Sequence, residues 1–114
     1  MAEQKHYFVA LDLECCFDKV HNAVTGSVTG TLIGRYDIPH PQGGDCIVLV
    51  YEKHYVRAGN RLTLTVVLDN FYGGDMTEVC CMGGGGGQGL CRFDWGAAED
   101  FEDVVHEALR PYRI

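Results

Sequence analysis

Hydrophobic and polar residues alternate along several short segments of the chain, which is typical of strands with one buried face. The clearest is 61–69, where Leu62, Leu64, Val66 and Leu68 alternate with threonine, valine and aspartate. Segment 45–57 also alternates, but the first half of it is apolar on both faces, so we expect both faces to be covered. Further β-prone segments occupy 6–11, 27–38 and 76–82.

Two segments instead repeat apolar residues at the three- and four-residue spacing of an amphipathic helix. The first begins after Asp12, which is suited to an N-cap, and stops near 25–26. The second begins near Ala97, with Gly96 as its N-cap, and ends before Pro111. The apolar positions are Leu13, Cys16, Phe17, Val20 and Val24 in the first helix, and Phe101, Val104, Val105, Ala108 and Leu109 in the second.

These elements follow the order β-α-β-β-β-β-α, and the short extended segment 90–95 is a candidate sixth strand. Because consecutive strands are joined by short loops, the order favours hairpins. We therefore predict one α+β domain over residues 1–114, an antiparallel sheet of four to six strands with two helices packed on one face. Gly30 and Gly34 interrupt a β-branched segment and indicate a close backbone contact or a bulge.

Composition narrows the function. The chain has 114 residues and a formal net charge of −7, so we expect no nucleic-acid partner. It has no apolar stretch as long as a membrane span and no apolar segment of signal-peptide length near residue 1, so we expect no membrane partner and a cytoplasmic protein. The six cysteines should then be reduced, and without a C-x-x-C pair they predict no metal site.

The most unusual segment is the run of five glycines at 83–87, followed by Gln88 and Gly89. Residues 84–89 match G-x-G-x-x-G, but a dinucleotide fold begins its helix at the last glycine. Here the predicted helix begins near Ala97 with an acidic first turn, and no Lys-Ser/Thr pair follows the glycines. We therefore predict a structural turn joining two strands and no cofactor. The alternative is a nest of backbone N–H groups that binds an anion.

Candidate chemistry is limited to Glu52 and His54, which share one strand face at two-residue spacing. They could share a proton or a ligand, or form a structural ion pair. We assign no catalytic residue. The candidate ligand-binding residues are Glu52, His54, Gly85, Gly86, Gly87, Gln88 and Trp95.

Four segments carry a resemblance: YEKHYVRAGNRLTLTV at 51–66, GGGQG at 85–89, FDWGAAEDF at 93–101 and GSVTGTL at 26–32. With them the chain resembles, over nearly its whole length, a small bacterial family of unknown function that is common in clostridia-like organisms. The resemblance implies no catalytic residue. It implies that GGGQG and WGA belong to the design of the fold.

The function is therefore not fixed by the sequence. The leading hypothesis is a non-enzymatic module that binds a small-molecule ligand or associates with itself, and the strand that is apolar on both faces favours a homodimer. The alternative is a small enzyme that uses Glu52 and His54 beside the amides of the glycine loop.

Overall fold

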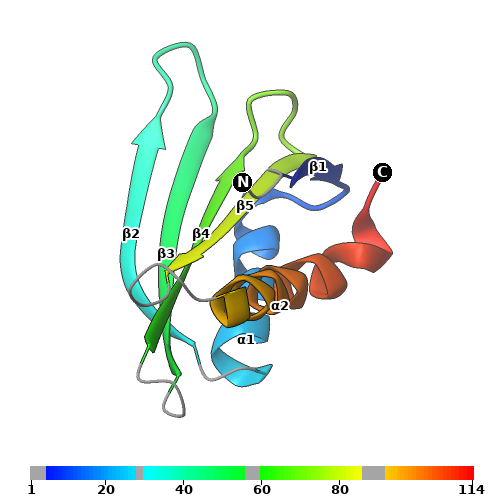
Figure 1. Cartoon of the computed structure of the whole chain (residues 1–114). Helices are drawn as coiled ribbons and strands as arrows, with labels where there is room; N and C mark the ends of the chain where they lie inside the picture. Colours follow the sequence, from blue (N-terminus) through cyan, green and yellow to red (C-terminus); the bar gives the residue numbers. More distant parts are fainter. Residues whose placement is uncertain (1–4, 28–29, 56–59, 86–91) are drawn as a thin grey trace.

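A computed structural model describes residues 5–27, 30–55, 60–85 and 92–114, and for 5, 27, 54–55, 60, 85 and 92–100 it describes the backbone alone. The described chain forms five strands, two α-helices and a short 3-10 helix (Figure 1). In order these are β1 (Lys5–Val9), α1 (Leu13–Ser27), β2 (Thr31–Pro39), β3 (Asp45–Tyr55), β4 (Asn60–Asp69), β5 (Thr77–Gly85), α2 (Arg92–Leu109) and η1 (Arg110–Tyr112).

The strands form one antiparallel sheet in the order β1-β5-β4-β3-β2, which makes β4 the middle strand. Strands β2 to β5 follow one another as hairpins, and β1 joins the sheet beside β5. The predicted antiparallel α+β fold is confirmed. In the described residues the sheet has five strands, within the predicted four to six.

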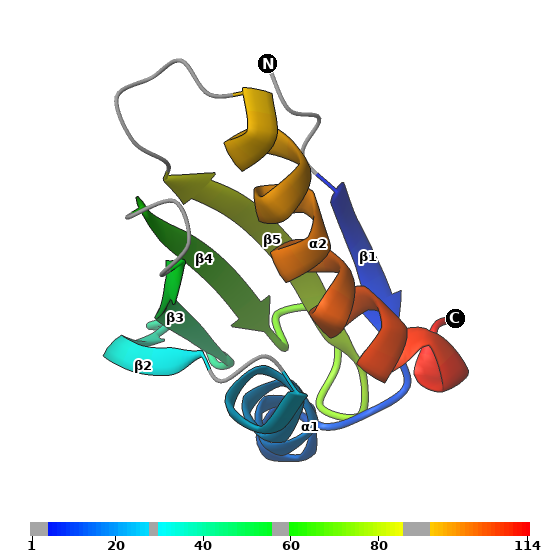
Figure 2. The ribbon, with the colours of Figure 1, turned by 60° about the horizontal axis from the view of Figure 1, so that its bottom comes forward.

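Both helices lie on the same face of the sheet, as predicted (Figure 2). This covered face and the inner faces of the helices form the hydrophobic core. The sheet contributes Tyr7, Val9, Ile47, Leu49, Tyr51, Leu62, Leu64, Val66, Leu68, Val79 and Cys81. The helices contribute Leu13, Cys16, Val20, Val24, Phe101, Val105 and Leu109. Burying these side chains removes their apolar surface from water, which is the main force that holds the two layers together.

Helix α1 begins where the sequence indicates. The side chain of Asp12 accepts a hydrogen bond of 2.8 Å from the backbone N–H of Cys15, which is the N-cap contact expected of an aspartate. This contact holds the pKa of the Asp12 carboxyl below its usual range. The helix then buries the apolar stripe predicted for it against the sheet and α2.

The two glycines of the second predicted strand have the two roles expected of them. Gly30 is buried, and a Cβ atom there would lie 2.7 Å from Cγ1 of Val24 and 3.4 Å from the Phe101 ring. Gly34 follows a shift in the register between β2 and β3, which is a β-bulge at Ile33. Strand β2 therefore begins at Thr31, after the close contact, and not at residue 27.

The segment before the last helix differs from the prediction. Helix α2 begins at Arg92, so no strand covers 92–95, and Gly96 lies inside the helix and is not its N-cap. The aromatic and glycine residues of this segment favour helix weakly, and the local pattern therefore indicated an extended chain. Residues 90–91, the other part of the candidate sixth strand, lie outside the described residues.

Candidate functional site

The candidate site residues of the sequence divide between described and undescribed parts of the chain. Glu52 lies half-buried on the face of β3 that points away from the helices, and its carboxylate lies 3.5 Å from Nη1 of Arg61. The side chains of His54 and Trp95 lie outside the described residues, although their backbones belong to β3 and α2. The Glu52–His54 pair therefore stays a prediction, whereas the Glu52–Arg61 pair is a contact that the sequence did not indicate.

The glycine run begins as a strand and not as a loop. Gly83, Gly84 and Gly85 belong to β5 and lie opposite Leu64, Thr63 and Leu62 of β4. The sequence predicts that the glycine run is a turn between two strands. This prediction is wrong, because β5 extends into the run and the element that follows is the helix α2. Gly86, Gly87 and Gln88, the remaining candidates, lie outside the described residues.

A buried carboxylate anchors the start of this run. Glu102 of α2 is 6% exposed, and its Oε2 atom accepts a hydrogen bond of 2.7 Å from the backbone N–H of Gly83. The described part of β1 starts at Lys5, opposite Cys81, so Gly83 lies beyond it along β5. Helix α2 thus supplies an acceptor to a strand N–H group for which the described part of β1 provides none.

The earlier start of α2 also changes the argument about nucleotide binding. The helix begins three residues after Gly89, so the gap between the glycines and the helix is shorter than the sequence indicated. The sheet provides a firmer objection, because β5 pairs only antiparallel, with β1 and β4. A dinucleotide-binding G-x-G-x-x-G belongs to a parallel β-α-β unit, which the described chain does not form.

Four of the described cysteines have a raised thiol pKa, so none of these four is an activated nucleophile. The five described cysteines are thiols outside any disulfide. Burial raises the pKa of Cys16 to about 12 and raises that of Cys81 still further above its usual range. The contact with Asp12 raises the pKa of the exposed Cys15 thiol, and burial raises that of Cys46. These four thiols are therefore protonated at neutral pH, which disfavours nucleophilic chemistry.

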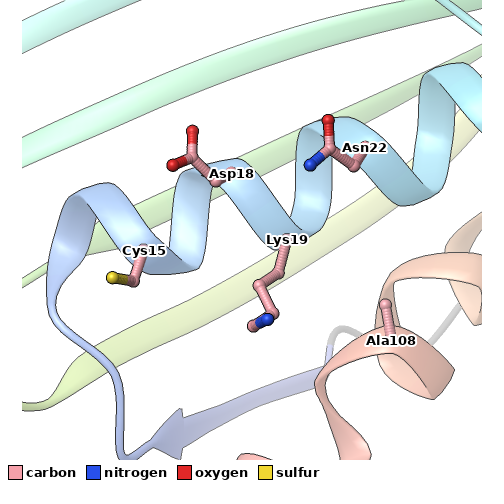
Figure 3. A pocket seen from close by; sticks show the side chains of 5 residues that line it. All are labelled: Cys15, Asp18, Lys19, Asn22 and Ala108. Carbon is pink, nitrogen blue, oxygen red and sulfur yellow. The ribbon is translucent and has the colours of Figure 1, made fainter.

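A shallow pocket lies between the two helices, lined by Cys15, Asp18, Lys19, Asn22 and Ala108 (Figure 3). Four of these side chains come from α1, and only Ala108 comes from α2. The pocket is open to solvent, and the ammonium group of Lys19 also lies over the ring of Tyr112, 5.1 Å from its centre. It lacks the enclosed apolar lining that is usual for a small-molecule site.

Two tyrosine–histidine pairs connect the helices to the sheet. The Tyr7 hydroxyl and His106 Nδ1 are 2.7 Å apart, and the Tyr51 hydroxyl and His21 Nδ1 are 3.0 Å apart. Burial raises the pKa of Tyr51 to about 12, and that of Tyr7 lies even higher. Both phenols therefore stay neutral and act as structural hydrogen-bonding groups. No local pattern indicates these pairs, because their members are 99 and 30 residues apart in the chain.

The main unassigned surface is the sheet face away from the helices, which we call the open face. Its centre, which we call the central band, consists of Val48, Val50, Thr65, Val67, Cys80 and Met82. These residues form two rows across β3, β4 and β5, because Val48 pairs with Val67 and Val67 with Cys80, and Val50 with Thr65 and Thr65 with Met82. None of the six carries a formal charge. Tyr36, Ile38 and Met82 on this face are 67%, 39% and 45% exposed.

A row of titratable residues lies at one end of the open face. Asp69 of β4 pairs directly with Glu78 of β5, and Cys46 of β3 lies on its other side. The His6 ring of β1 contacts the Glu78 carboxylate at 3.2 Å, and the Phe71 N–H donates to Asp69 at 3.2 Å. Burial and the negative charge of Glu78 raise the pKa of Asp69, although the Phe71 bond opposes them.

Within the described ranges, no three His, Cys, Asp or Glu side chains gather in a way that could hold a metal ion. The helices there also include none that is both long and apolar enough to cross a membrane. The described residues form an antiparallel five-stranded sheet with two helices on one face, and the other face is apolar at its centre and charged at its ends.

A protein-family comparison identifies this class of domain more closely. Residues 1–113 match the model of a family described as a family of unknown function, DUF6054. The chain therefore belongs to that family, in agreement with the resemblance noted in its sequence. No curated protein and no solved structure matches the chain.

Proposed function

We propose that this domain is a self-association module whose open sheet face binds the same face of a second copy. The observation that carries the proposal is the central band, an uncharged surface in the middle of a sheet whose described helices both lie on the other face. Antiparallel sheets with one solvated face usually place polar residues there. In this chain valine and methionine occupy those positions, and large hydrophobic side chains beside them are exposed.

The charge distribution favours a second copy as the occupant. The chain carries a formal net charge of −7, which would oppose association through most of its surface. The central band places no charge at the contact, so two copies can meet there while their acidic helices point apart. Burial of the exposed Tyr36, Ile38 and Met82 would provide the hydrophobic gain.

The size of the open face also suits a dimer. Five strands spaced about 4.8 Å apart, each of about eight residues at about 3.3 Å per residue, make a flat face of roughly 600 Å². Side chains projecting from this face add to its surface area. Stable protein interfaces bury about 800 Å² from each partner, with a lower limit near 600 Å². The area therefore suits a homodimer.

The test replaces one residue at the centre of the band. Val67→Lys places a charge in the interface, whereas in a monomer the same side chain would reach solvent and leave the fold intact. Asn22→Lys, on the exposed surface of α1, makes the same change in net charge away from the band. We expect sedimentation equilibrium to give dimer mass for the wild type and for Asn22→Lys, and monomer mass for Val67→Lys with an unchanged circular dichroism spectrum. A wild type that stays monomeric up to about 1 mM would overturn the proposal.

Two further expectations accompany this function. The small-molecule site at Glu52, His54, Gly85, Gly86, Gly87, Gln88 and Trp95 stays a prediction. The alternative, an enzyme that would use Glu52 and His54, also stays a prediction. We also expect the protein to act in the cytoplasm, which agrees with the five described thiols.

A further inference from the structure

The middle strand of the open face has opposite charges at its two ends. On this face β4 presents Arg61, Thr63, Thr65, Val67 and Asp69. Arg61 and Asp69 are each four residues from Thr65, or about 13 Å along the strand. The strand is therefore basic at one end, acidic at the other and neutral between them.

Each end has a local environment that favours an opposite charge from outside the subunit. At the acidic end Asp69 lies beside Glu78, and like charges directly opposite on neighbouring strands destabilise each other. Glu78 contacts the His6 ring, and Asp69 accepts a hydrogen bond from the backbone N–H of Phe71 and shares another with the Glu78 carboxyl. At the basic end the Arg61 side chain is 67% exposed, and its Nη1 atom lies 3.5 Å from the Glu52 carboxylate.

Symmetry leaves two simple ways to stack two copies face to face, because the two-fold axis must lie in the plane of the interface. An axis along the strands places every row of residues over the same row of the other copy. Asp69 and Glu78 would then lie over the same acidic row, with four carboxylates gathered at one end. An axis across the strands instead reverses β4 and brings unlike ends together.

We propose that the two copies pack with their β4 strands antiparallel and the two-fold axis at Thr65, so that Arg61 meets Asp69 of the partner subunit. This inference rests on the proposed self-association and adds the orientation to it. The same axis places Val50 and Met82, which share the row of Thr65, over their own counterparts. Only the row of Thr65 is thus opposed to itself, and its neighbouring row of Val48, Val67 and Cys80 lies over the row of Glu52, Thr63 and Gly84 in the partner subunit. Both ionic contacts lie at the ends of the strand, where charges commonly fix the register of an interface.

The test is a charge exchange. Arg61→Glu alone and Asp69→Arg alone each place like charges opposite one another at both ends of the interface. We expect each to raise the dimer dissociation constant about tenfold or more. The double variant, with both substitutions, restores unlike pairs and should return the constant to within about threefold of the wild type. Sedimentation equilibrium measures all four proteins, and thermal unfolding by circular dichroism verifies that each is folded.

Lys19→Glu and Asp18→Arg repeat the two charge changes on the exposed surface of α1 and should leave the dimer unchanged. The outcomes separate the two proposals. A wild type that is monomeric overturns self-association itself. Suppose instead that Val67→Lys dissociates the dimer. If either single charge reversal then leaves the dimer intact, or the double variant fails to restore it, the antiparallel orientation is wrong and the proposed self-association still stands.

Discussion

The carboxylate of Glu102 accepts the backbone N–H of Gly83 at 2.7 Å, and this bond ties the start of the glycine run to the middle of α2. It connects the most unusual sequence segment of the chain to its core. Glycine lacks a side chain, so the helix can approach the strand closely at this point. The first part of the run is thus built into the sheet and fixed by a side chain 19 residues further along the chain.

We predict that Glu102→Ala destabilises the fold by about 1–3 kcal/mol, because the partly buried N–H group of Gly83 loses its acceptor. Glu102→Gln retains a side-chain oxygen that can accept the bond and should cost less. Urea unfolding followed by circular dichroism measures both. Exposed Glu107→Ala, one turn further along α2, serves as the control and should change stability by less than about 0.5 kcal/mol. Equal stability of Glu102→Ala and the control would contradict the role of this bond.

Two glycines near the end of α1 should respond oppositely to alanine. A Cβ atom at Gly30 would lie 2.7 Å from Cγ1 of Val24, so Gly30→Ala forces the packed helix and the Phe101 ring to move. Overpacking of this kind costs about 1–3 kcal/mol. At Gly26, inside α1, a Cβ atom would have nothing within 4 Å, so Gly26→Ala should stabilise the helix by up to about 1 kcal/mol.

The midpoints of urea unfolding for the two alanine variants should therefore move in opposite directions from the wild type. A Gly30→Ala variant as stable as Gly26→Ala would show that the contact with Val24 relaxes without cost.

The sequence predicts well what depends on local pattern. The N-cap at Asp12, the alternation through β4 and the apolar stripe of each helix are all set by neighbours within a few residues, and the structure confirms them. It fails at the start of α2. There Phe93, Trp95 and Gly96 have weak helical preference, yet they belong to α2.

The open face shows why the candidate site was harder to predict. Alternation places Arg61 and Asp69 on one face of a strand, so their symmetric spacing about Thr65 is readable from the sequence. The strand order is not readable from it. Only the sheet topology makes β4 the middle strand and brings Glu78 beside Asp69. Likewise, the contact of Glu52 with Arg61 depends on the register of β3 with β4.

The environment of Asp69 leads to a pH dependence of the proposed dimer. In the single subunit, burial and then the charge of Glu78 raise the pKa of Asp69 above its ordinary value of 3.8, against the Phe71 N–H bond. In the dimer, Arg61 of the partner subunit favours the charged carboxylate and lowers this pKa. The dimer then binds fewer protons than two separate subunits. Association should therefore strengthen as pH rises through the pKa of Asp69 in the single subunit, and weaken as pH falls through it.

The groups that face Asp69 are Glu78 from β5 and Cys46 from β3, and His6 of β1 acts through Glu78. Asp69→Asn keeps an oxygen for the Phe71 N–H and removes the titrating charge. We expect the wild-type dissociation constant to rise on acidification from pH 7 towards the ordinary aspartate pKa, because dissociation takes up at most about two protons per dimer. In Asp69→Asn the constant should change much less. Sedimentation at each pH at which the circular dichroism spectrum is unchanged gives the constants. The same acid response in both proteins would assign the pH dependence to another group and remove Asp69 from the interface.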